Sequence, residues 1–170
     1  SDLKRNFDQI FEKKWEDNDQ ALAMAMGNVD TLRWGVVSRD ERAALVLFTR
    51  KIEKMFGVGK FTPSAIKAGF CYFNLMQGKT NPNLQAYQGM LQTDLDRTMQ
   101  VVLALDNMSG KWNKYDFIRM LGLRFKYGVG ADLVMLCQIP HVGQARAKKL
   151  KMAKINNVDD FLKHDVNTLM

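Results

Sequence analysis

The sequence predicts an all-α protein, a helical bundle followed by a small helix-hairpin-helix domain. Apolar residues recur at spacings of three and four along nearly every segment of the 170-residue chain, which is the pattern of amphipathic helices. The strict alternation of apolar and polar residues that indicates a half-buried strand is almost absent. Because 46% of the residues are apolar, the chain has enough apolar material for a proper core.

Apolar stripes and a capping box predict the first two helices. The first stripe consists of Leu3, Phe7, Ile10, Phe11 and Trp15. Ser38 and Glu41 have the spacing of a capping box, in which the side chain of each residue accepts a hydrogen bond from the backbone N–H of the other. The stripe behind this box consists of Leu45, Phe48, Ile52, Met55 and Phe56. We expect the sequence GVGKF, residues 57–61, to end that helix.

Two further helices are expected to begin at Pro63 and Pro82. A capping residue, Thr62 or Asn81, precedes each proline. Proline suits the first helical position because the N–H that it lacks would have no partner there. The helix from Pro82 is expected to reach about Met108.

The length of that helix is open, because a second start lies within it. Thr93, Asp94 and Asp96 are residue types that cap helices, and a cap there would split the segment in two. Ser109 and Gly110 end the segment in either case. The next stripe consists of Trp112, Tyr115, Ile118, Leu121 and Phe125. It predicts a helix that ends at Tyr127 and Gly128, and we place the boundary there, with the bundle in residues 1–127 and the second domain in residues 128–170.

The composition predicts a soluble protein of the cell interior, in the cytoplasm or nucleoid. No stretch of about 18 uncharged apolar residues is present, and the N-terminal sequence lacks the apolar region of a signal peptide, so no membrane partner is expected. Cys71 and Cys137 lie in apolar helix patterns, which favours buried reduced thiols over a disulfide. Because the chain begins with Ser1 and not with methionine, we expect a piece of a longer protein.

The positive charge is concentrated near the C-terminus. Of the net charge of +7, residues 111–170 contribute 11 Lys and Arg against 5 Asp and Glu, whereas residues 1–110 contribute 14 against 13. A basic field at one end attracts a polyanion such as nucleic acid. A lysine-rich face that is merely solvated explains the charge alone equally well.

Neither a nucleotide-binding loop nor an active site is predicted. Gly78, Lys79 and Thr80 match the end of a P-loop, but the glycine that this motif needs five positions earlier is replaced by Phe73, so the stretch is interpreted as a helix C-cap and a turn. No cluster of metal ligands accompanies the two histidines. Asp159 and Asp160, which follow Asn157, are interpreted as residues of a helix start. The chain itself is therefore expected to hold no cofactor and to be no enzyme.

The sequence IPHVGQARAKKL, residues 139–150, predicts a helix-hairpin-helix. We expect a short helix over 131–138, a turn over 139–143, a helix over 144–152 and a third helix over 157–163. Pro140 fixes the direction of the chain at the turn, and Gly143 is expected to let the backbone turn sharply. The small core of this unit is expected to consist of Leu136, Ile139, Val142, Ala147 and Leu150.

This hairpin is a candidate phosphate-binding site. The backbone N–H groups at the start of its second helix are free, and together with the helix dipole they can hold a phosphate oxygen. Arg146, Lys148 and Lys149 can then reach neighbouring phosphates of one strand, which positions nucleic acid without reading its bases. The candidate DNA-binding residues here are Pro140, His141, Val142, Gly143, Gln144, Ala145, Arg146, Lys148 and Lys149. The alternative is a hairpin that only packs against its neighbour.

Residues 123–162, LRFKYGVGADLVMLCQIPHVGQARAKKLKMAKINNVDDFL, resemble a known family. The stretch is similar to the C-terminal end of superfamily 2 fork-repair DNA helicases of the archaeal type, which are related to the helicase half of DNA polymerase theta. The positions that fit are Arg124, Lys126, Gly128, Val129, Leu133, Val142, Gly143, Arg146, Ala147, Lys148 and Leu150. The resemblance covers about 40 residues and is moderately specific, since many DNA-binding proteins contain such a hairpin.

The resemblance also assigns roles outside the hairpin. It implies that the upstream bundle contains a ratchet helix that contacts single-stranded DNA, with residues 93–108 as the candidate helix and Arg97 as its phosphate or base contact. Lys126 becomes a further candidate DNA contact. The chain departs from the family pattern at three positions. Ala104 replaces the stacking tryptophan, His141 replaces the first hairpin glycine, and Gln144 replaces the first arginine of the basic run.

The function that the resemblance implies is sequence-independent binding of single-stranded or forked DNA, as an accessory region of a helicase in DNA replication or repair. ATP and Mg²⁺ are expected only in helicase motor domains, present in cis or in trans, because the motor motifs are absent from this sequence. Two alternatives stay open. One is a protein-interaction module that docks on a helicase or replisome partner, and the other is the DNA-binding part of a repair nuclease.

Overall fold

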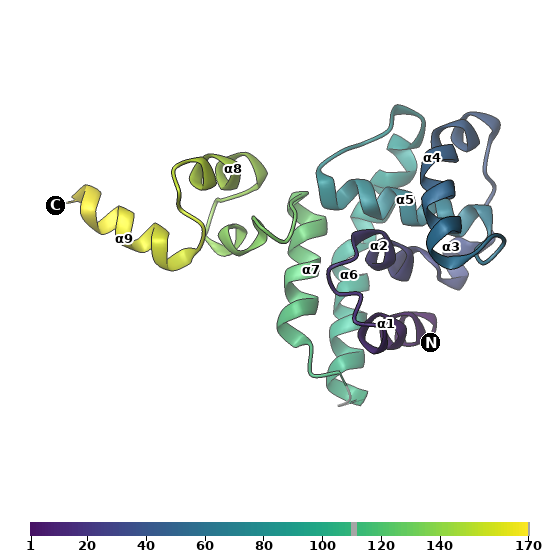
Figure 1. The fold of residues 1–170 in the computed structure, drawn as a ribbon, viewed down its shortest axis with the longest axis horizontal. Helices are drawn as coiled ribbons and strands as arrows, with labels where there is room; N and C mark the ends of the chain where they lie inside the picture. Colours follow the sequence, from purple (N-terminus) through teal and green to yellow (C-terminus); the bar gives the residue numbers. More distant parts are fainter. Residues whose placement is uncertain (110–111, 170) are drawn as a thin grey trace.

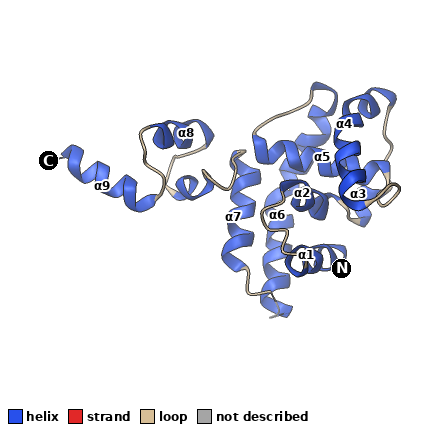
Figure 2. Ribbon diagram, viewed as in Figure 1, coloured by secondary structure: helices blue, strands red, loops and turns tan. Residues whose placement is uncertain are grey.

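A computed structural model describes the backbone of residues 1–109 and 112–169 and the side chains of residues 1–108 and 112–164. Every regular element in these residues is a helix, which confirms the predicted all-α class (Figure 2). The elements are α1 (Asp2–Glu12), α2 (Asp19–Gly27), α3 (Asp30–Arg33), α4 (Arg39–Phe56), α5 (Pro63–Gln77), η1 (Pro82–Leu84), α6 (Gln85–Ser109), α7 (Tyr115–Tyr127), η2 (Val134–Gln138), α8 (Gln144–Met152) and α9 (Val158–Leu169).

Helices α1 to α7 form a bundle, and η2, α8 and α9 extend from it beyond the end of α7 (Figure 1). Helix α2 lies at the centre of the bundle, with every residue from Ala21 to Gly27 buried. It crosses α5 where two glycines meet, because a Cβ on Gly27 would lie 2.5 Å from the backbone nitrogen of Gly69. The two backbones can approach this closely because neither glycine carries a side chain.

The predicted helix starts are confirmed. Ser38 and Glu41 form the capping box, with 3.2 Å from the Glu41 N–H to Ser38 Oγ and 2.8 Å from the Ser38 N–H to Glu41 Oε1. Thr62 Oγ1 accepts a hydrogen bond from the N–H of Ala65. Asn81 caps the short 3₁₀ helix η1, which leads directly into α6. These local signals fix where the chain enters the bundle.

Helix α6 is continuous from Gln85 to Ser109, so the alternative with a second start near Thr93 is wrong. Thr93 Oγ1 donates to the carbonyl of Gly89 one turn earlier, and Asp94 forms an ion pair with Arg97. Neither residue caps a helix, and Asp96 also lies within the helix. The candidate ratchet segment, residues 93–108, is therefore the later part of one longer helix. The predicted stop at Gly110 lies outside the described residues.

Helix α7 takes part in two hydrophobic cores. Ile118, Leu121 and Phe125 belong to the core of the bundle. On another side of the helix, partly buried apolar residues contact a second core, which lies in residues 129–155. These contacts are made by Met120, Leu123 and Tyr127. The second core contains four of the five residues predicted for it, Leu136, Ile139, Val142 and Ala147, with Leu150 packed against its edge. The C-terminal elements are thus joined to the bundle through a shared helix.

The segment predicted as a helix over 131–138 differs from the expectation. Residues 131–133 form a turn, and the helix that follows, η2, is of the tighter 3₁₀ type. The N–H groups of Leu133 and Val134 both donate to the carbonyl of Gly130, which closes the chain into this turn. The predicted third helix is α9, which extends beyond residue 163, and its start is capped as expected because Asn157 Oδ1 accepts from the N–H of Asp160.

Two glycines form the junction between the bundle and the C-terminal elements. Gly78 and Gly128 end α5 and α7, and both have a φ of +66°, the left-handed conformation that favours glycine. A Cβ on Gly128 would lie 2.6 Å from the Cα of Gly78, so the two backbones touch. The Nε2 atom of Gln144, at the start of α8, donates to the carbonyl of Gly128 over 2.6 Å.

Arg124 strengthens the same junction from inside. Its guanidinium is buried, with Nη2 2.8 Å from Asp19 Oδ2 and Nε 3.2 Å from the carbonyl of Val129. Asp19 lies in the first turn of α2, where a carboxylate also complements the helix dipole. One side chain thus connects α2, α7 and the chain that leaves α7. This arginine, which fits the family pattern, is enclosed in the protein.

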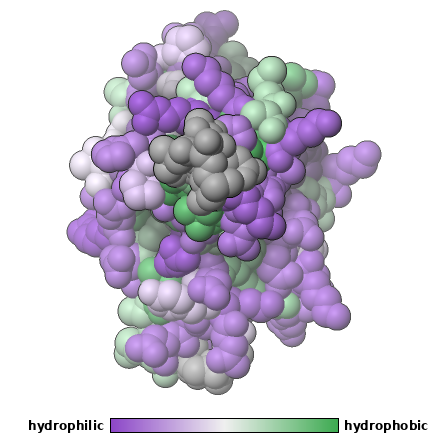
Figure 3. Space-filling view, turned by 90° about the vertical axis from the view of Figure 1, so that its left-hand side faces the viewer, coloured by the Kyte–Doolittle hydropathy of each residue, from purple (hydrophilic) through white to green (hydrophobic). Residues whose placement is uncertain are grey.

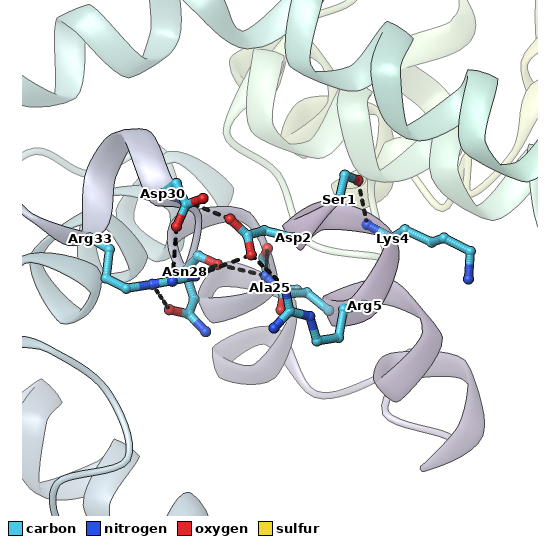
Figure 4. A network of polar contacts seen from close by, with 9 residues as sticks. Ser1, Asp2, Lys4, Arg5, Ala25, Asn28, Asp30 and Arg33 are labelled. Carbon is cyan, nitrogen blue, oxygen red and sulfur yellow. Dashed lines mark hydrogen bonds and ion pairs between the residues drawn. The ribbon is translucent and has the colours of Figure 1, made fainter.

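A polar network connects α1 to α3 and to Asn28, which lies between α2 and α3 (Figure 4). Asp2 Oδ2 accepts from the N–H of Asp30 over 2.9 Å, and the guanidinium of Arg33 lies 3.4 Å from Asp2 and 3.0 Å from Asp30. The side-chain amide of Asn6 donates to the carbonyl of Asn28. The hydrogen bond from Asp30 is the main cause that lowers the pKa of Asp2, and Arg33 lowers it further, against the opposing effect of burial.

The lowered pKa of Asp2 predicts a stability that depends on pH. Because the folded state favours the carboxylate, Asp2 stabilises the fold above its ordinary pKa of 3.8, and this contribution disappears as the pH falls through the lower folded value. We expect Asp2→Asn to melt below the wild-type protein at pH 7, with the difference closing below pH 3.8. Circular dichroism melts across this range measure it. A difference that stays constant as the pH falls below 3.8 would contradict the assignment.

The close contact between Gly78 and Gly128 predicts that one added methyl group lowers stability strongly. Gly128→Ala adds a Cβ at a left-handed φ and against the backbone of Gly78, and we expect the free energy of unfolding to fall by about 2–4 kcal/mol. Gly89→Ala is the matched control, because it adds the same group within α6 where nothing lies within 4 Å. That control should raise stability by about 1 kcal/mol. Urea unfolding followed by circular dichroism compares the two, and equal effects would rule out the junction contact.

Candidate nucleic-acid interface

The turn between η2 and α8, residues 139–143, has two buried anchors and an exposed tip. The side chains of Ile139 and Val142 are buried in the second core, and the N–H of Val142 donates to the carbonyl of Ile139 over 3.1 Å. Pro140 and His141 lie between these anchors and are exposed. The tip of the turn is therefore held in place by its apolar neighbours while its own side chains face solvent.

The sharp change of direction occurs at His141 and not at Gly143. His141 has a φ of +68°, the left-handed region in which histidine is one of the more tolerated non-glycine residues. Gly143 has a φ of −105° and is extended, and a Cβ there would only reach Tyr127 at an ordinary 3.7 Å. The expectation that Gly143 makes the turn is wrong. The resemblance seen in the sequence predicts a glycine at this position, and the backbone of His141 has a conformation that suits glycine.

Helix α8 begins without a side-chain cap. The carbonyl of Gly143 accepts from the N–H of Ala147 over 2.9 Å, which closes the first turn. The N–H groups of Gln144, Ala145 and Arg146 find no acceptor among the described residues. Such a group of amides, at the positive end of the helix dipole, favours an anion.

The side chain of Gln144 points away from this group of amides. Its Nε2 atom donates to the carbonyl of Gly128, and it lies against Gly78, so close that a Cβ there would clash with it. Among the candidate DNA-binding residues, Gln144 therefore offers its backbone N–H, while its side chain holds α8 against the bundle. The arginine that the sequence resemblance predicts at this position would be longer and charged.

Three cations of α8 lie beside the amides and have no carboxylate partner among the described residues. Arg146, Lys148 and Lys149 are all exposed, and the guanidinium of Arg146 lies over the turn, 2.7 Å from the carbonyl of His141. Lys151 differs, because its Nζ atom is 2.5 Å from Asp132 Oδ2. This hydrogen bond is the main cause that lowers the pKa of Asp132. The free positive charge of α8 is thus greatest around its first two turns.

Lys126 lies close to the same junction and is accompanied by a cation that the sequence interpretation missed. Lys126 and Lys79 are exposed and line one polar hollow of 220 Å³ beside Gly78 and Gly128. Lys126 also lies over the ring of Tyr127, with 5.4 Å from Nζ to the ring centroid. Lys79 belongs to the stretch that was considered only as a P-loop. The stretch is a C-cap and a turn as expected, and that turn carries the lysine to the end of α7.

Arg97 is not brought together with these residues. It lines a hollow of 280 Å³ together with three carboxylates, those of Asp2, Asp30 and Asp94, and its guanidinium lies 3.5 Å from Asp94. Met99, two positions later and therefore about 200° around the helix, packs against Gly122 of α7. Arg97 thus points away from α7, and Asp94 offsets its charge within the hollow.

The end of the molecule that carries α8 and α9 is mostly hydrophilic. Figure 3 views this end directly, and polar residues cover most of the described surface there. Isolated apolar residues, among them Met152 and Leu162, are exposed on it.

A second cluster of titratable groups, inside the bundle, has a structural role. Lys67 Nζ is 2.7 Å from Glu41 Oε2 and 4.2 Å from the ring centroid of Tyr87, and the lysine is almost fully buried. Burial raises the pKa of the nearby Cys71 to about 12, so this thiol stays protonated and is a poor nucleophile. Both cysteines are free and buried, as expected.

Two features are absent from the described residues. These residues contain no group of three side chains of His, Cys, Asp or Glu that could hold a metal ion. None of their helices is both long enough and apolar enough to span a bilayer.

Comparison with known proteins assigns no family to the chain. No protein-family model matches it, and no curated protein shows a significant match. The resemblance of residues 123–162 to helicase C-termini stays a prediction.

Removing the hydrogen bond between the Gln144 side chain and the carbonyl of Gly128 should lower stability and leave the net charge unchanged. Gln144→Ala leaves the carbonyl of Gly128 without its hydrogen bond, and we expect the free energy of unfolding to fall by about 1–2 kcal/mol. Lys148→Ala is the control on the same helix, and as an exposed substitution it should change stability by less than about 0.5 kcal/mol. Urea unfolding measures both variants. If Gln144→Ala is as stable as the control, the side chain does not hold the junction.

Proposed function

We propose that this chain binds single-stranded or forked DNA through its phosphates, without reading base sequence, as an accessory region of a superfamily 2 DNA helicase. The observation that carries the proposal is the meeting of three free amides at the start of α8 with the unpaired cations Arg146, Lys148 and Lys149. Amides and cations together supply what a phosphate needs, directional donors and positive charge.

The geometry supports contact with one strand. The amides of residues 144–146 can hold one phosphate oxygen, and Arg146 and Lys149, three positions apart, lie side by side on α8 toward the next phosphate. Lys126 and Lys79 extend the positive surface past the junction toward the bundle. We leave Arg97 out of the proposed contacts because carboxylates surround it.

The link to a helicase rests on the resemblance of residues 123–162. In that setting the motor domains, which bind ATP and Mg²⁺, are in cis or in trans, and this chain guides the strand that they move. A contact restricted to phosphates suits such a role, because a moving strand presents every base in turn and only the backbone stays the same.

Neutralising the three cations should abolish most of the binding. We expect the triple variant Arg146→Gln, Lys148→Gln, Lys149→Gln to bind a labelled single strand at least roughly tenfold more weakly at 50 mM salt. The plot of log affinity against log salt should become shallower, with a slope that is less negative by about 2. Fluorescence anisotropy across a salt series measures both quantities, with duplex and forked DNA as further ligands.

A second triple variant with the same change in net charge distinguishes a specific binding site from a general effect of net charge. Arg42→Gln, Arg50→Gln and Lys60→Gln remove three positive charges at the other end of the bundle, and should change DNA affinity less than threefold, within about 0.7 kcal/mol. Equal losses in the two triple variants indicate a diffuse electrostatic effect and overturn the assigned site. Undetectable binding of every DNA at 50 mM salt overturns the proposed function itself.

A further inference from the structure

A groove of 850 Å³ lies along α4, at the end of the molecule opposite to α8 and α9 (Figure 1). One wall is a single face of α4, whose lining residues recur at spacings of three and four from Arg42 to Glu53. The other wall is the chain of residues 57–61 and the start of α5. The apolar lining residues are Leu45, Val46 and Ile52 of α4, Val58, Phe61, Pro63 and Ile66 of the other wall, and Val37, which precedes α4.

The dimensions of the groove match a short helix. Residues 42–53 span about 16 Å along α4, which is three helical turns. Two of the apolar lining residues are exposed to solvent, Val46 by 44% and Val58 by 84%. An apolar trough of this length, open on one side, is the surface into which an amphipathic helix places its apolar face.

The charges around the groove favour an occupant with negative charge. Arg42, Arg50 and Lys60 line it, are exposed and have no carboxylate partner among the described residues, whereas Glu53 is the one acidic residue in the lining. Elsewhere in the bundle, cations of α1, α3 and α7 are paired with carboxylates. A second copy of this face would bring like charges together, so self-association through the groove is disfavoured.

We propose that this groove docks an acidic amphipathic helix of a partner protein. The apolar stripe of that helix lies on Val46 and Val58, and its Asp and Glu residues face Arg42, Arg50 and Lys60. The site is separate from the α8 surface, so a strand of DNA and a protein partner can be held at opposite ends of the same chain.

Three labelled peptides of about 18 residues, long enough to form a helix, test the proposal by fluorescence anisotropy with the full chain. The first carries Leu along one helical face and Glu elsewhere, the second has the same composition in an order that breaks the stripe, and the third has Lys in place of Glu. We expect the first to bind at least tenfold more tightly than either of the others, about 1.4 kcal/mol. Equal binding of the first and second peptides overturns the proposal.

Substitutions then locate the peptide. Val58→Asp, in an exposed loop position that leaves folding intact, and the triple variant Arg42→Gln, Arg50→Gln, Lys60→Gln should each weaken the first peptide at least tenfold, about 1.4 kcal/mol. The α8 triple variant should bind it like the wild-type chain. Unchanged binding in both groove variants overturns the site. Size-exclusion chromatography tests whether a second copy of the chain occupies the groove instead. If the wild-type chain is a dimer and Val58→Asp is a monomer, the groove is a dimer interface and the proposal of an acidic partner is wrong.

Discussion

The contact between Gly78 and Gly128 fixes how the C-terminal elements sit on the bundle. Two helices end there with the same left-handed glycine, and their backbones touch because neither carries a side chain. Gln144 then bonds the carbonyl of Gly128 and brings the first turn of α8 against this point. The direction in which the free amides of α8 face solvent is set by this junction. Electrostatics determines what the surface attracts, but backbone packing determines where it is.

Local signals predicted most of the fold. The box of Ser38 and Glu41 and the anchors of the η2–α8 turn could be predicted because their partners lie within a few positions in sequence. The 3₁₀ form of η2 could not, because it depends on how the chain closes over Gly130. The left-handed residue was misplaced for a similar reason. Glycine is the usual choice for this conformation, and Gly143 stands only two positions after His141.

The site was predicted less completely, because it combines distant segments. The cations of α8 could be recognised as one run, but the inward direction of the Gln144 side chain depends on Gly78 and Gly128, which belong to two other helices. Lys79 joins Lys126 only because α5 and α7 end side by side. Arg97 was selected by family pattern; Asp94 precedes it by one turn on α6, and the fold brings Asp2 of α1 and Asp30 of α3 to the same hollow.

The two hydrophobic cores share α7, and this has a mechanical consequence. A flexible linker between them would absorb a pull on one side before the other side moved. Helix α7 instead contributes side chains to both cores, and the buried Arg124 ties its end to α2. A tension applied at α8 is therefore transmitted to the centre of the bundle through the packed side chains of one helix.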